Sequence, residues 1–227
     1  MATQADIELV RKALAGLSDR AKVDLVDIWS AIDHTDYRQV RRLVAQFWPS
    51  LIGKYGDIAA ALAADMFRLQ AEVLGIKARL EVADGVNPAR ANARANWALT
   101  QPDQFGNLVV LLDELVKQPY RSTFQDSAVK SGAGWARVPS GSETCAFCLM
   151  LASRGAVYHT KQTAGGRGKK FHGGCGCEVV LVRDERDYPP GYDPDSLYQD
   201  YLDARAASAS DSTSSILSEM RDQLGIN

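Results

Sequence analysis

The sequence lacks any apolar run long enough to cross a membrane, and it does not open with the basic start and apolar block of a secretory signal. Its charges nearly cancel, with 26 Lys and Arg against 28 Asp and Glu, so the whole chain shows no electrostatic signature of nucleic-acid binding. We therefore expect a soluble protein made in the cytoplasm, where cysteines stay reduced. Its 227 residues suffice for one or two compact domains with a sizeable core.

Cysteine is scarce, and the few cysteines are clustered. Cys145 and Cys148 form a CxxC motif, and His172, Cys175 and Cys177 form an HxxCxC motif about two dozen residues later. Thiolates and imidazoles at such spacing are the ligands of tetrahedral structural zinc sites. We predict a structural zinc site in which four of these five residues bind and one is spare. The favoured set is Cys145, Cys148 and Cys177 with either His172 or Cys175.

Three other interpretations of the cysteines compete with metal binding. Disulfides between the two motifs are disfavoured by the expected reducing compartment. A thioredoxin-type redox motif would need a strand before the CxxC and a βαβ pattern around it, and the sequence shows neither. Four unrelated buried thiols would not be expected to gather in one part of the chain.

Apolar residues recur at helical spacing through the first 131 residues, which predicts antiparallel helices packed into a bundle. Thr3 is a candidate N-cap for the first helix, and Ser18 for a second. Pro49 and Pro119 are expected to end, kink or interrupt helices, and Gly75 to follow a helix end. The segment 76–86 is either a strand or a connector. The expected helices span residues 3–17, 18–32, 35–49, 50–74, 88–99 and 103–119, with a further stretch reaching 131.

One apolar face is predicted for the helix over 50–74. Its expected core positions are Ile58, Leu62, Met66, Leu69 and Val73.

The pattern changes at residue 132. Short strands are predicted over 135–138 and 178–182, with a possible third at 156–158 and a short helix after Cys145 that ends at Gly155. We call residues 132–184 the Cys/His module. It has little core of its own, so a metal ion would supply the stability that burial cannot.

A proline-rich linker and helices over 195–207 and 216–224 follow the module. The predicted fold class is therefore mainly α with a small α+β C-terminal module, a helical bundle followed by a metal-stapled β-rich module. The predicted domains are 1–131, 132–184 and 185–227, and we expect the first to fold without the second.

The order of motifs in the module resembles the C-terminal signature of phage Mu F-like minor head proteins. Trp135 in a strand, the CxxC, an apolar helix with a glycine end, the HxxCxC and a final strand match that signature in order. Gly173 stands where the family commonly has proline, and Gly176 where it often has arginine. The helical first part resembles the branch found in tailed phages of actinobacterial hosts.

The resemblance implies a low-copy minor capsid protein that acts in head morphogenesis. Such a protein would reside in the virion, inside the capsid, and its partners would be the portal protein, the major capsid protein or both. The resemblance implies a structural role, so we expect no enzymatic activity and name no catalytic residue.

Two enzymatic alternatives remain. A capsid maturation protease could use Ser142 with His159 or His172, although no G-x-S-x-G context is present. A metal-dependent nuclease of HNH type could use His159 as its base.

Basic residues allow a further alternative, contact with nucleic acid. A glycine-rich loop could contact DNA non-specifically through Lys161, Arg167, Lys169 and Lys170. Arg90 and Arg94, one helical turn apart, are better explained as a solvated helix face than as an anion site.

Overall fold

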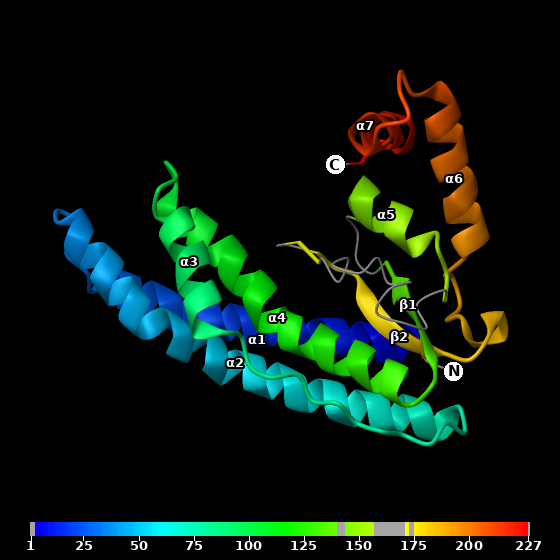
Figure 1. Ribbon diagram of the computed structural model, residues 1–227, viewed down its shortest axis with the longest axis horizontal. Coiled ribbons are helices and arrows are strands. Elements are labelled where there is room, and N and C mark those ends of the chain that lie inside the picture. The colour runs from blue at the N-terminus through cyan, green and yellow to red at the C-terminus, as the bar shows by residue number, and fades with distance from the viewer. Residues whose placement is uncertain (1–2, 140–143, 157–170, 173–174, 227) are drawn as a thin grey trace.

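The structure, a computed structural model, describes residues 3–139, 144–156, 171–172 and 175–226. Three long helices form a bundle, and a two-stranded sheet lies at one end of it, with shorter helices on the far side of the sheet (Figure 1). This arrangement confirms the predicted fold class. The elements are α1 (Gln4–Ser30), α2 (Tyr37–Val73), α3 (Pro88–Ala98), α4 (Gln104–Lys130), β1 (Gly134–Val138), α5 (Ala146–Ala152), β2 (Glu178–Val182), a 3-10 turn η1 (Glu185–Asp187), α6 (Pro194–Ala207) and α7 (Thr213–Leu224).

The bundle helices are longer than predicted. The Thr3 cap is confirmed, because Thr3 and Asp6 form a capping box, but α1 continues through Ser18, which is buried within it. Helix α2 continues through Pro49. Proline at this position removes the hydrogen bond to the carbonyl four residues earlier. Asn92 of α3 replaces it by donating its Nδ2 to the Ala45 carbonyl at 3.2 Å, so tertiary contact compensates for the proline.

The predicted core face of α2 is wrong at three of its five positions, whereas Leu62 and Met66 are half-buried and pack against the core. Ile58, Leu69 and Val73 are exposed by 48%, 55% and 68%, and the buried face is instead alanine-rich with Phe67 at its centre. Small side chains let α2 and α4 approach closely along their length. The residues of α2 buried against the rest of the bundle include Tyr55, Gly56, Ala59, Ala60, Ala63, Ala64, Phe67, Gln70 and Ala71.

Helices α2 and α4 also come close at the second proline. A Cβ atom at Gly56 would lie 3.1 Å from Cγ of Pro119. The predicted interruption at Pro119 is wrong, because α4 continues through this residue, and the proline ring packs against Gly56 of α2.

The segment between α2 and α3 is a connector and not a strand. Gly75 adopts a positive φ of 66° after the end of α2, as predicted. The extended chain then runs along α4, where Ser131, Ser127 and Thr123 accept hydrogen bonds from the backbone amides of residues 79, 81 and 83. The match is geometric, because four helical residues advance about 6 Å and two extended residues about 6.6 Å.

The sheet joins the module to the bundle. Strands β1 and β2 are antiparallel, with Trp135 opposite Leu181, and both strands are buried along their whole length. Trp135 and Leu181 share one core cluster with Phe67 of α2 and Phe124 of α4. The amide of Leu181 also donates to Gln70 Oε1 of α2 at 2.9 Å. Independent folding of residues 1–131 stays a prediction, but part of their core is completed by the module.

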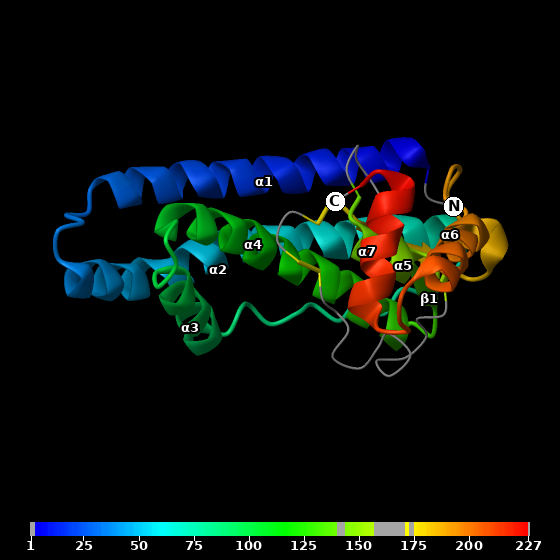
Figure 2. The same ribbon diagram turned by 90° about the horizontal axis from the view of Figure 1, so that it is seen from above.

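The C-terminal helices lie on the side of the module away from the bundle (Figure 1), and they overlie α5 and β1 when the molecule is seen from above (Figure 2). Helices α6 and α7 enclose α5 with a small cluster built around Ala146, Ala204 and Met220. The predicted helices at 195–207 and 216–224 are thus confirmed, with α7 starting three residues earlier. Predictions for residues 157–158 and for the basic loop at 161–170 fall outside the described residues.

Candidate metal centre

The CxxC motif lies at the start of a short helix. Cys145 is the N-cap residue of α5, and its carbonyl accepts hydrogen bonds from the amides of Cys148 and Leu149. One helical turn therefore separates the two cysteines, and this spacing places both thiols on the same side of α5.

The second motif leads into β2. The amide of Cys175 donates to the His172 carbonyl at 3.1 Å, which holds these two residues close together. Cys177 directly precedes the strand. Strand β2 pairs with β1 and packs on the bundle, so the residue that directly precedes it, Cys177, has a fixed position.

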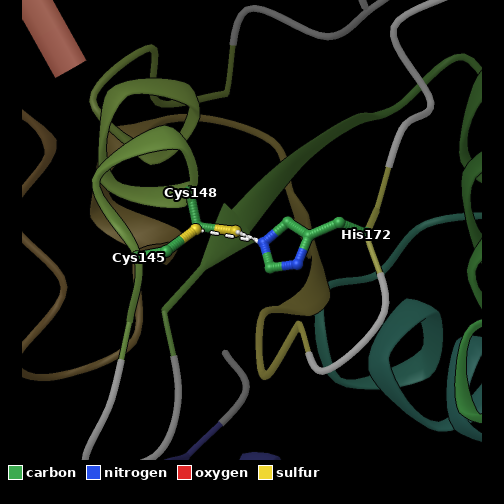
Figure 3. A group of neighbouring side chains, drawn as sticks. All are labelled: Cys145, Cys148 and His172. Atoms are coloured by element: carbon green, nitrogen blue, oxygen red, sulfur yellow. Dashed lines mark hydrogen bonds between the residues drawn. The ribbon is translucent and has the colours of Figure 1, made fainter. Parts of the chain in front are cut away.

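The two motifs meet at the imidazole of His172. Its Nε2 lies 3.0 Å from Sγ of Cys145 and 3.3 Å from Sγ of Cys148. Figure 3 shows the ring directed at the two sulfur atoms from the opposite side. The Sγ atoms of Cys148 and Cys175 are 3.4 Å apart. Residues separated by more than twenty positions therefore present their ligand atoms to one point.

All five predicted ligands belong to two overlapping groups. One group is Cys145, Cys148 and His172, and the other is Cys148, Cys175 and Cys177, with the ligand atoms of each within 4.8 Å of one another. Cys148 is common to both. Zinc with sulfur at about 2.3 Å and nitrogen at about 2.0 Å would separate its tetrahedral ligands by about 3.5–3.8 Å. The donor set and its spacing fit one such ion after small side-chain adjustments.

The four cysteines are free thiols, and three of them are buried. The sulfur of Cys148 is too far from that of Cys175 for a disulfide, which requires about 2.05 Å. Hydrogen bonds from the side chains of Cys175 and Cys177 lower the pKa of Cys148, with a smaller contribution from the charge of Arg137. Burial raises the pKa of the Cys145 thiol. These hydrogen bonds favour the thiolate form of Cys148.

A cleft of about 1060 Å³ adjoins the cluster on the side of His172. Phe147 and Phe171 contribute to its wall, and the start of α3 with Arg90 lies across from them. Arg94 forms a two-point ion pair with Glu114 of α4, at 2.8 and 2.7 Å, which supports its predicted role on a helix face.

Sequence reasoning missed the buried charges behind the cysteines. Arg121 of α4 donates its Nη2 to the Cys175 carbonyl at 2.7 Å and to the Cys177 carbonyl at 3.5 Å. Arg137 of β1 is equally buried. Arg137 could have been noticed, because it interrupts an apolar strand, whereas an arginine on a helix gives no such signal.

Glu178 is a third buried charged residue, at the start of β2. Burial raises its pKa to about 8, against the opposing charge of Arg121. Three buried charged side chains from outside both motifs, Arg121, Arg137 and Glu178, therefore lie next to the second motif.

Several predicted residues are not placed. Ser142, His159 and the four cations Lys161, Arg167, Lys169 and Lys170 lie outside the described residues. The protease, nuclease and DNA-contact hypotheses therefore stay predictions. Only His172 among the candidate catalytic residues is described, and it lies within the cysteine cluster.

The family described as VG15 protein matches residues 1–204, which is most of the chain. The chain is similar to the Gene 15 protein of Mycobacterium phage D29, with 34% identity over 106 residues, covering 35% of this chain and 38% of that protein. It is also similar to the Gene 15 protein of Mycobacterium phage L5, with 34% identity over 99 residues, covering 28% of this chain and 34% of that protein.

These matches span little more than a third of the length of the curated relatives. No solved structure matches the chain. None of the helices in the described part is long and apolar enough to cross a membrane.

Proposed function

The chain belongs to the VG15 protein family, whose curated relatives here are phage proteins, and from this premise we propose that it is a minor structural protein of the phage head. Its proposed location is the virion, inside the capsid or at the portal. Its proposed partners are the portal protein, the major capsid protein or both.

The observation that carries a structural role is the closed character of the Cys/His cluster. A catalytic zinc site keeps one position open for water or substrate, whereas a structural site is filled by protein ligands. Here five donors converge for four positions, and three of the thiols are buried by the sheet and the bundle. The cluster is suited to holding two segments of chain together.

We assign zinc as the metal, held by four of Cys145, Cys148, His172, Cys175 and Cys177. When bound, the ion would supply a cross-link between α5 and the chain that leads into β2. The protein's own part is to orient the thiols from a helix start and a strand start. Because the affinity of a structural metal is folding free energy, the ion would add to the stability that the module gains from its packing on the bundle.

The resemblance to Mu F-like minor head proteins supports the finer assignment. The resembling elements are adjacent in space, since the strand of Trp135 pairs with the strand that follows the HxxCxC. A protease that uses His172 as its base is less favoured. His172 lies 3.0 Å from a cysteine sulfur, and an imidazole that ligates a metal is not free to act as the base of a protease.

Purified phage particles test this proposal directly. Mass spectrometry of particles from the parent phage should detect the chain at low copy number relative to the major capsid protein. Chemical cross-linking inside the same particles should join it to the portal or the capsid shell. Absence of the chain from infectious particles would contradict a virion role, and capsid-protein cleavage that stops when His172 is replaced in a folded chain would favour the protease.

A further inference from the structure

Two buried arginines flank the residue that precedes His172. Arg121 comes from α4 and Arg137 from β1, and each is exposed by only 1%. Their guanidinium carbons lie 4.0 and 3.8 Å from the centroid of the Phe171 ring. Two cations that are distant in the sequence are thus enclosed beside the cysteine cluster.

No carboxylate forms an ion pair with Arg121 in the part of the chain that the structure describes, although Glu178, which is also buried, lies near enough for the two charges to interact. Nη2 donates to the carbonyls of Cys175 and Cys177, while Nε and Nη1 are buried without a hydrogen-bond partner. Burying a cation is costly unless an opposite charge lies nearby. The two hydrogen bonds from Nη2 also place this cation beside the backbone of Cys175 and Cys177, in the second motif.

The cysteine cluster can supply the missing negative charge. A divalent ion with three thiolates and one imidazole has a net charge of −1, and with four thiolates it has −2. Such a centre is itself unfavourable in a buried place unless cations surround it. The charges of the buried arginines and of a thiolate-rich centre therefore compensate each other.

We propose that Arg121 and Arg137 are positioning residues of the metal centre, whose charge stabilises a net negative thiolate complex. Arg121 has the further task of holding the backbone of Cys175 and Cys177 in place for ligation. This inference rests on the proposed metal centre. It implies a thiolate-rich donor set and a preference for Zn²⁺ or Co²⁺ over ions that favour oxygen ligands.

Titration of the reduced, metal-free full chain with Co²⁺ tests the proposal. The thiolate-to-cobalt charge-transfer band reports how many thiolates bind, and competition with a chelator gives the affinity. The variants are Arg121→Met, Arg121→Lys and Arg137→Met. The matched control is Gln125→Met, one turn further along α4, because Gln125 is buried to the same 1% and its polar atoms also lack partners, but it carries no charge.

We expect both methionine variants at the arginines to bind Co²⁺ about 10- to 100-fold more weakly, the usual effect of losing an outer-shell partner. Lysine at position 121 should recover most of this loss, because it keeps the charge, and Gln125→Met should bind as the wild type does. Far-UV circular dichroism should show unchanged helix content in each variant.

Three results would overturn the inference. Arg121→Met could bind as tightly as the wild type, lysine could bind no better than methionine, or Gln125→Met could lose as much affinity as Arg121→Met. If Arg121→Met does not fold, the Co²⁺ affinities of Arg121→Lys and Arg137→Met still test the inference. A wild type without a charge-transfer band would refute the metal centre itself, and the inference with it, whereas a normal band with unaffected arginine variants would refute only the inference.

Discussion

Replacing Trp135 by alanine should destabilise the bundle as well as the sheet. The side chain is 2% exposed and belongs to the same core cluster as Phe67 and Phe124 of the long helices. An indole buries about 200 Å², which at about 25 cal/mol per Å² sets an upper value near 5 kcal/mol. Large-to-small changes of this kind lower the free energy of unfolding by about 3–5 kcal/mol, and we expect a decrease in that range for Trp135→Ala.

Trp97→Ala is the matched control, because Trp97 is 61% exposed on α3. Its cost should be below about 1 kcal/mol. Urea unfolding should be followed by far-UV circular dichroism, which reports the helices and does not depend on the fluorophore removed. The wild type and Trp135→Ala should each unfold in a single transition, with the midpoint lowered in the variant.

The reasoning fails if Trp135→Ala shifts the helical transition no more than Trp97→Ala does. That outcome would mean that the long helices are stable without the packing of the sheet against them. It would agree with the independent folding of residues 1–131 predicted from the sequence.

Four further substitutions have defined outcomes. Cys148→Ser should abolish metal binding and make the Cys/His module sensitive to limited proteolysis, since Cys148 belongs to both ligand groups; resistance equal to the wild type would show that the cysteines do not hold the module. Gly155→Ala should lower the free energy of unfolding by more than about 1 kcal/mol, because φ is +58° at this residue. Gly16→Ala is its control: a Cβ there meets open space on α1, so this change should raise the free energy of unfolding by about 0.5–1 kcal/mol. Hydrogen bonds from Arg183 lower the pKa of Asp187 to about 2, so the ion pair stabilises the fold above pH 4 and this stabilisation is lost as the pH falls through 2. Asp187→Asn should therefore lower the free energy of unfolding by about 1–2 kcal/mol at pH 7. In unfolding experiments the difference between the variant and the wild type should vanish near pH 2.

Local signals in the sequence predicted the elements, and tertiary contacts decided where they end. Thr3 caps α1 as predicted, because a capping box needs only neighbouring residues. Ser18 and Pro49 gave false helix boundaries, since apolar periodicity continues through the first and Asn92 satisfies the carbonyl freed by the second. A single chain gives no sign of a compensating residue more than forty positions away.

The predicted core face of α2 was wrong at Ile58, Leu69 and Val73 for a related reason. Hydrophobicity ranks Leu69 above Ala63, but the close packing of α2 on α4 buries the smaller residue. The convergence of the Cys and His side chains was predictable because their spacing in the sequence is typical of metal sites. The buried Arg121 was not, because its role depends on which helix face meets the second motif.

The central claim is that one metal ion joins the two cysteine motifs, and the metal content of the native protein tests it most directly. Native mass spectrometry of the chain purified under reducing conditions should show one zinc ion per chain, lost together with the fold of the Cys/His module when Cys148 is replaced by serine. A folded wild-type chain that carries no metal, or that has disulfides linking the two motifs, would contradict the claim.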